Sequence, residues 1–155
     1  MPAISNITGL FETHLPVADL DRSIQFYRDR IGLQLARVVP DRNVAFLWVA
    51  GPEQGMLGLW GGQAGPLRMT LHFAFRLALS ELVDLPDRLG ARGIQPLGFH
   101  AEPVVEPVVI GWMPAASVYC KDPDGHSLEF LSPLRDPADD DFGIGPLSHW
   151  RARHR

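Results

Sequence analysis

The feature of this sequence that most constrains its fold is an internal repeat. Each half of the chain predicts a strand, a helix and three further strands, in that order, which makes two βαβββ units. The units cover about residues 8–62 and about residues 66–133. A glycine ends the helix in both, within Gly32-Leu33-Gln34 and Gly93-Ile94-Gln95. The repeat therefore predicts an α+β fold whose two units are related by an approximate two-fold axis.

In the first unit, the apolar spacing changes from that of a strand to that of a helix and back. Phe11–Val17 predicts a strand, and Asp19 can cap the helix that follows and ends at Gly32. The apolar stripe of this helix consists of Leu20, Ile24, Tyr27 and Ile31. The three remaining strands are predicted over Leu33–Val39, Val44–Ala50 and Met56–Trp60.

The second unit repeats this order with a longer connection. Leu67–Arg76 predicts its first strand, and Ser80 can cap a helix that Pro86 should kink or split. Ile94–Gly98 predicts the next strand. The last two strands form a predicted hairpin over Ser117–Pro133, which turns at Asp122-Pro123-Asp124-Gly125.

Composition limits the class of protein. The 155 residues suffice for one domain with a full core, and we expect residues 1–135 to form it. The net charge is −4 and the basic residues are scattered, which argues against nucleic acid or a membrane as partner. Cys120 is the sole cysteine, and neither a leader nor a membrane span is recognisable, so we predict a cytoplasmic protein. Residues 136–155 lack periodicity and are expected to form a tail that is mobile or contacts a partner subunit.

Two histidines and one glutamate suggest a metal site. His14 and His72 lie in the first predicted strand of their units, each on the face turned away from the helices. Glu129 lies in the middle of the last apolar strand, where a carboxylate is costly to bury unless a cation or a donor meets it. Two imidazoles and one carboxylate suit a catalytic divalent metal with open coordination positions. We therefore predict that these three side chains are metal ligands.

Three stretches of the chain resemble the vicinal oxygen chelate superfamily of glyoxalase I, fosfomycin-resistance enzymes, extradiol dioxygenases and bleomycin-resistance proteins. They are HLPVADLDRSIQFYRDRIGLQL, LHFAF and YCKDPDGHSLEF. The resemblance covers about residues 8–133 and implies a curved, half-open mixed sheet around a central cavity. It also implies a small-molecule substrate, a homodimer and one divalent ion per site, whether Mn, Ni, Zn or Fe(II).

The resemblance leaves two Lewis-acid reactions open. Glyoxalase I usually has a second glutamate on the fourth strand of the first unit, where this chain has Gly58, so a glyoxalase-like enzyme would need Glu12 as its base. A fosfomycin-type transferase would use glutathione or another thiol, and its phosphonate substrate would need cations. The candidates for those cations are Lys121, Arg68 and Arg135.

Two other functions are consistent with the resemblance. An extradiol dioxygenase would hold Fe(II) with the same three ligands and would use His100 or Tyr119 near the oxygen. Bleomycin-resistance relatives instead bind a drug without metal or turnover. Such binding proteins generally lack the ligand set, so intact His14, His72 and Glu129 favour an enzyme.

The segment Phe99–Ala115 is long for a connection inside a domain, and such segments are usually functional. We expect it either to lie over the site, with Trp112 and Met113 lining an apolar substrate pocket, or to pack against a second subunit. Trp48 and Trp60, by contrast, are interpreted as core residues.

Overall fold

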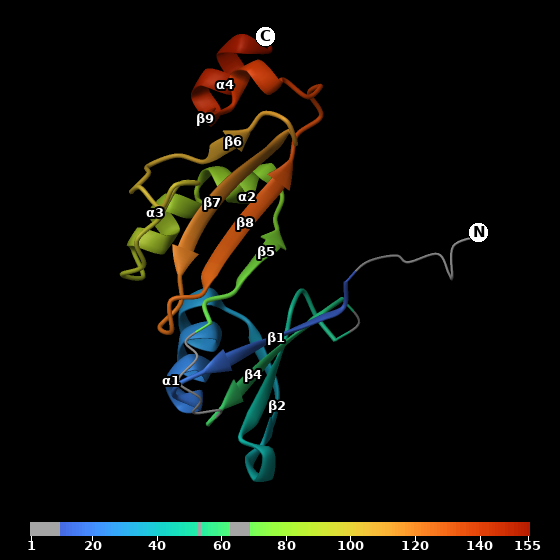
Figure 1. Ribbon diagram of the computed structural model, residues 1–155, viewed down its shortest axis with the longest axis vertical. Helices are drawn as coiled ribbons and strands as arrows, with labels where there is room; N and C mark the ends of the chain where they lie inside the picture. The colour runs from blue at the N-terminus through green and yellow to red at the C-terminus, as the bar shows by residue number, and fades with distance from the viewer. Residues whose placement is uncertain (1–9, 53, 63–68) are drawn as a thin grey trace, which may run out of the picture. The chain divides into compact units, whose positions relative to one another are not determined.

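The computed structural model describes residues 10–52, 54–62 and 69–155. The chain divides into two compact units, residues 1–69 and 70–155, and each is considered by itself. Each unit contains one open mixed sheet and its own helices (Figure 1). The α+β class predicted from the repeat is therefore confirmed.

The first unit has a four-stranded sheet with the order β1-β4-β3-β2. β1 and β4 pair in parallel, and the other neighbours pair antiparallel. All four predicted strands are present, with ends that differ by one or two residues. The elements are β1 (Glu12–Val17), α1 (Leu20–Gln25), the π-helix η1 (Phe26–Ile31), β2 (Gln34–Val39), the 3-10 turn η2 (Pro40–Arg42), β3 (Val44–Trp48) and β4 (Met56–Gly61).

The helix of the first unit begins and ends where the sequence predicts. The Asp19 carboxylate accepts a hydrogen bond from the Arg22 amide at 3.0 Å, which caps the helix. At the other end Gly32 has φ 92°, a left-handed conformation that glycine adopts without strain. Ile24 is buried where α1 packs against β3 and β4, and Tyr27 of η1 is buried as well. One face of the sheet is thereby covered.

The second unit has a five-stranded sheet with the order β5-β8-β7-β6-β9. The predicted helix is split in two near Pro86, as expected. The first part, α2, ends at Val83, and the second, α3, begins at Leu85. The cap of α2 is Ala78, so the prediction of Ser80 as cap is wrong. The elements are β5 (His72–Arg76), α2 (Leu79–Val83), α3 (Leu85–Gly90), β6 (Val108–Ile110), β7 (Ala115–Lys121), β8 (Ser127–Pro133), the 3-10 turn η3 (Asp140–Phe142), β9 (Ile144–Pro146) and α4 (Leu147–Arg153).

The predicted strand Ile94–Gly98 does not form. Within it, Leu97 makes only isolated bridges, to Pro103 and Tyr119. Pro96 has no amide hydrogen to donate to a neighbouring strand. The buried β-branched residues of β6 pair with β7 instead, and β6 occupies the position next to β7 in the sheet. The second strand of this unit therefore comes from the long segment Phe99–Ala115, which was expected to be a connection.

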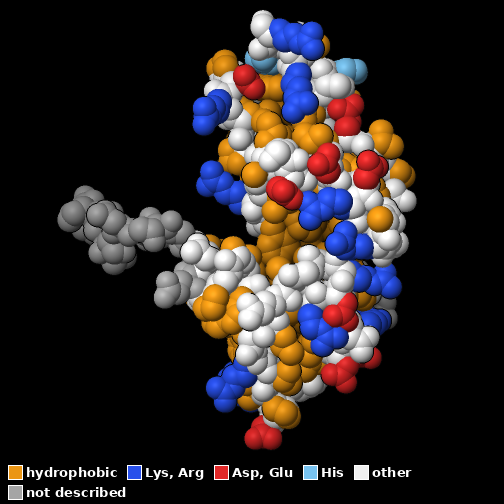
Figure 2. All heavy atoms as spheres, turned by 180° about the vertical axis from the view of Figure 1, so that it is seen from behind, with side chains coloured by type: hydrophobic (Ala, Val, Ile, Leu, Met, Phe, Trp, Pro, Cys, Tyr) orange, Lys and Arg blue, Asp and Glu red, His pale blue; other side chains and the backbone are white. Residues whose placement is uncertain are grey.

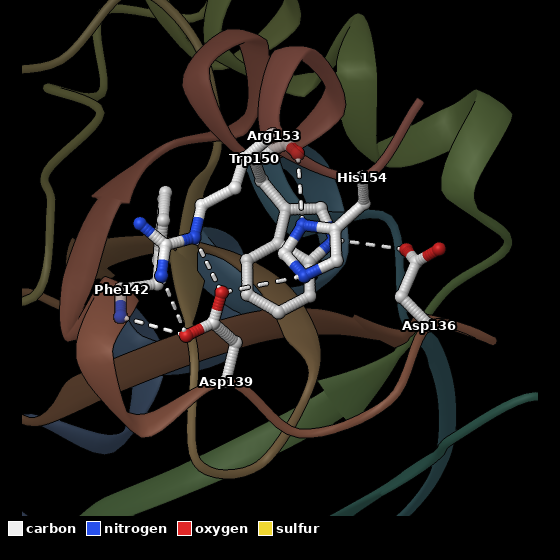
Figure 3. Close-up of polar contacts among 6 residues, drawn as sticks. All are labelled: Asp136, Asp139, Phe142, Trp150, Arg153 and His154. Atoms are coloured by element: carbon white, nitrogen blue, oxygen red, sulfur yellow. Dashed lines mark hydrogen bonds and ion pairs between the residues drawn. The ribbon is translucent and has the colours of Figure 1, made fainter.

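Residues 136–155, expected to be mobile or to contact a partner subunit, form regular structure on the second unit. β9 pairs with β6, and α4 packs on them through Trp150, which is 1% exposed. The Trp150 indole donates a hydrogen bond to Asp136 at 2.8 Å (Figure 3). Asp139 binds Arg153, whose guanidinium holds the pKa of that carboxyl below its ordinary value. A contact of this segment with a second subunit stays a prediction.

We predict that Trp150→Ala lowers the free energy of unfolding by about 3–5 kcal/mol, because it empties a buried aromatic site and removes a hydrogen bond. Urea unfolding followed by circular dichroism measures this change. His149→Ala, at the exposed neighbouring position, is the control and should change stability by less than about 0.5 kcal/mol. Equal effects of the two variants would show that α4 is not packed.

Candidate functional site

In the second unit, the sheet brings His72 and Glu129 together. β5 and β8 are parallel neighbours, with His72 opposite Ser127 and Ala74 opposite Glu129. The two side chains therefore lie two positions apart on the same face. His72 Nε2 is 3.2 Å from Glu129 Oε2. Two of the three ligands predicted from the sequence are thus in contact.

Glu129 is a buried carboxylate whose first oxygen is held by hydroxyl groups. Ser117 and Tyr119, both on β7, donate hydrogen bonds to Oε1 at 2.6 and 2.9 Å. Burial, followed by the charge of Glu129, raises the pKa of Tyr119 far above its ordinary value, so the phenol keeps its proton and remains a donor. These bonds offset the cost of burying the carboxylate and leave Oε2 turned toward His72.

The imidazole of His72 is oriented by the backbone of β8. Its Nδ1 lies 3.1 Å from the carbonyl oxygen of Ser127. A carbonyl only accepts hydrogen bonds, so Nδ1 donates in this contact, and a neutral ring with its proton on Nδ1 would have the lone pair of Nε2 available for a metal. Metal-binding histidines have this arrangement, in which the second ring nitrogen donates to a carbonyl or carboxylate. His72 and Glu129 therefore fit a metal, although no three His, Cys, Asp or Glu side chains within the described ranges form one cluster.

A cavity of about 430 Å³ opens beside this pair. Trp112 and Met113 line it, as does Lys121, the one cation among the described lining residues. The prediction that the long segment lies over the site agrees with this placement, while contact with a substrate stays a prediction. The remaining lining residues are His72, Leu97, Gly98, Phe99, Ala101, Ile110, Tyr119, Ser127 and Glu129.

Other predicted residues lie elsewhere. The ring of His100 contacts that of Phe99 edge-on, and neither His100 nor Arg135 is among the described lining residues. Arg135 is exposed, and Arg68 lies outside the described residues. His126, on the neighbouring turn, is buried, and its Nδ1 accepts a hydrogen bond from the Leu71 amide at 3.0 Å.

In the first unit, His14 has a different set of partners. Its Nε2 lies 3.0 Å from Glu12 Oε1, and its Nδ1 accepts a hydrogen bond from the indole of Trp60. Sequence reasoning missed Trp60, because a strand tryptophan usually belongs to the core and its contact with His14 arises only from the pairing of β1 with β4. His14 and Trp60, together with Leu15 and Pro16, line a cavity of about 520 Å³.

Charged side chains of both signs are interspersed on the face drawn in Figure 2. On this face, Lys and Arg side chains do not gather into one continuous patch. None of the helices in the described ranges has the length and apolar character needed to cross a bilayer.

The chain matches the family described as the Glyoxalase/Bleomycin resistance protein/Dioxygenase superfamily over residues 9–130. It therefore belongs to that superfamily, which confirms the resemblance seen in the sequence. Among curated proteins, none matches the chain.

Solved structures agree with this assignment. An integron cassette protein from the mobile metagenome of the Halifax Harbour sewage outfall is 36% identical, with a TM-score of 0.71 over 81% of this chain and 99% of that one. A lactoylglutathione lyase from Agrobacterium tumefaciens is 25% identical, with a TM-score of 0.62 over 83% and 96% of the two chains. The oxidase ChaP-H1 is 26% identical, with a TM-score of 0.63 over 84% and 100%.

Cys120 is buried on β7, and burial raises the pKa of its thiol to about 12. We predict that a disulfide reagent at pH 8 reacts with the native protein far more slowly than with the unfolded chain. The native thiol has roughly a thousandth of the thiolate of a free cysteine at that pH. The variant Cys120→Ser, which has no thiol, is the control for background reaction of the reagent. Rapid stoichiometric labelling of the native protein would contradict this prediction and make Cys120 a candidate nucleophile.

Proposed function

We propose that this chain is a divalent-metal-dependent enzyme that binds adjacent oxygens of a small-molecule substrate, in lyase or transferase chemistry of the glyoxalase or fosfomycin-resistance type. The observation that carries the proposal is the contact of His72 Nε2 with Glu129 Oε2 beside a cavity, with both side chains already oriented by other hydrogen bonds. His14 is the third ligand in the prediction from sequence. The proposal includes a homodimer in the cytoplasm, by analogy with the family.

A metal bound there would supply Lewis-acid stabilisation of negative charge that develops on the substrate oxygens. The chain's own residues prepare the ligands for that task. Ser117 and Tyr119 fix the Glu129 carboxylate, and the Ser127 carbonyl fixes the His72 ring. An imidazole and a carboxylate together suit Mn, Fe(II), Ni or Zn.

The cavity lining limits the substrate of a transferase. Lys121 is the one cation among the described lining residues, and most of the others are apolar or aromatic. A dianionic phosphonate would meet one cationic side chain among them, so within the proposal the lining favours the glyoxalase type over the fosfomycin-resistance type. A thiol cosubstrate such as glutathione remains part of the proposal for lyase or transferase chemistry, as the lactoylglutathione lyase likeness suggests.

Oxygen-dependent chemistry with Fe(II), as in an extradiol dioxygenase, is the second candidate. Phe99, Trp112 and Tyr119 give the cavity aromatic walls that suit a planar apolar ring. The likeness to the oxidase ChaP-H1 points in the same direction. The element bound would separate the candidates, since iron favours oxygen chemistry and Mn, Ni or Zn favours Lewis-acid reactions.

We expect the purified protein, reconstituted with Mn²⁺, Ni²⁺, Zn²⁺ or Fe²⁺, to retain about one metal ion per chain, because its ligands are preoriented. His72→Ala and Glu129→Gln should each lose the metal in elemental analysis. Glu81→Gln, which makes the same chemical change on the exposed surface of α2, should retain it. A wild-type protein that takes up none of the four ions would refute the metal-enzyme proposal and favour a metal-free binding protein.

We also predict that Tyr119→Phe and Ser117→Ala each weaken metal binding by about 10–100-fold, because they remove a donor that orients the Glu129 carboxylate. Isothermal titration with Mn²⁺ measures the change, and circular dichroism verifies the fold. Unchanged affinity in both variants would mean that Glu129 does not bind the metal.

A further inference from the structure

We propose that Lys121 selects the substrate in the second unit, because its ammonium group binds a single anionic group, such as a carboxylate, on a molecule whose remaining body is apolar or aromatic. The proposal rests on the proposed function and deepens it by naming the class of substrate. Lys121 thereby has a role in specificity, while the chemical step stays with His72 and Glu129.

Lys121 lies on the face of its strand that carries the candidate site. Alternation along β7 places Ser117, Tyr119 and Lys121 on one face. Ser117 and Tyr119 use this face to donate hydrogen bonds to Glu129. Lys121 also lines the cavity of about 430 Å³ beside the site. The cation and the candidate ligands therefore share one cavity.

The register of the sheet sets the spacing between Lys121 and His72. Ser127 of β8 is opposite Lys121 on one side and opposite His72 on the other. Neighbouring strands are about 4.8 Å apart, so the backbones at the two ends of this row are separated by roughly 10 Å. An anion bound at Lys121 would lie apart from oxygens beside His72 and Glu129. This spacing favours a substrate whose anionic group is separate from its adjacent oxygens.

The ammonium group of Lys121 is available to a ligand. Within the described ranges, no carboxylate forms an ion pair with it. Glu129 is the one acidic side chain among the described lining residues, and other partners engage both of its oxygens. Lys121 is exposed, so an anion can reach it without displacing other side chains. A charge-assisted hydrogen bond to a ligand is the interaction that this group can still form.

The rest of the cavity lining favours an apolar body on the substrate. Trp112 and Phe99 are 67% and 45% exposed, so a ligand that covered them would remove apolar surface from water. Leu97, Ile110 and Met113 add further apolar surface. None of these five side chains can pair with a second charge. The lining therefore fits one negative charge on a hydrophobic molecule, as in an arylcarboxylate.

The first experiment compares three probes that share one ring system and differ in charge. Isothermal titration of the full chain at pH 8, without added metal, measures the affinity for 2-naphthoate, 2-naphthamide and 2-naphthyl phosphate. We expect the acid to bind about 10-fold more tightly than the amide, because only the acid pairs with the ammonium group. The dianionic phosphate should bind no more tightly than the acid. The preference for the acid should shrink at high salt.

Variants of one residue then assign this preference. Lys121→Met, which keeps the length of the side chain and removes the charge, should bind the acid about 10-fold more weakly and the amide unchanged. Lys121→Arg should retain the preference. Arg135→Met is the control for lost charge, because Arg135 is exposed and is not among the described lining residues. Circular dichroism verifies that each variant is folded.

The composition of the chain allows a direct view of the ammonium group. Lys121 is the only lysine among the 14 Lys and Arg residues. Reductive methylation with ¹³C-formaldehyde keeps the charge and labels this side chain and the terminal amine alone. We expect 2-naphthoate to shift the Lys121 resonance in ¹³C NMR spectra and to leave that of the terminal amine unchanged. The amide should shift the Lys121 resonance much less.

The outcomes separate this inference from the proposed function. Equal affinity for acid and amide, failure of both to bind, tighter binding of the phosphate, or a preference that survives in Lys121→Met would each overturn the inference. The metal-uptake measurement on the same protein tests the proposed function separately. A preference for the acid in a protein that takes up none of the four ions would overturn the metal-enzyme proposal alone and leave Lys121 as the anion site of a binding protein.

Discussion

The parallel pairing of β1 with β4, and of β5 with β8, is the constraint on which the rest depends. Parallel neighbours cannot be joined by a tight turn, so everything between β1 and β4, or between β5 and β8, has to act as a crossover. The helices α1 and α2 in these crossovers pack on one face of their own sheets. The register of the same strand pairs decides which polar side chains are neighbours on the opposite face, and so sets the contact of His72 with Glu129.

Much of the fold was readable from local chemistry. Asp19 as a cap, Gly32 as a stop, Pro86 as a break and the turn at Gly125 each act within a few residues of their own position. The sequence could not show that β6, and not Ile94–Gly98, forms the strand beside β7, because both are apolar runs and only the folded chain decides which one reaches β7. The structure of residues 136–155 was missed for a similar reason, since its apolar anchor meets a surface that only the assembled sheet provides.

For the candidate site, the sequence could predict on which face of a sheet each side chain lies, but not which side chains are in contact. Alternation along a strand assigns Glu12 and His14 to one face, but a shift of two residues leaves every side chain on its original face. Periodicity therefore could not tell which of the two contacts Trp60. The contacts of the histidine rings were equally out of reach, because the Trp60 indole and the Ser127 carbonyl are distant from them in the sequence.

The short strand β9 has a consequence for how the second unit behaves among its copies. The outer edge of a sheet offers unpaired amides and carbonyls to which another chain can add, and such addition leads to aggregation. Here β9 occupies the edge beside β6, is three residues long and ends at Pro146, which has no amide to donate. The C-terminal segment thus covers the edge of β6 with a strand too short to template the addition of another chain, a consequence that its polar and irregular sequence does not suggest.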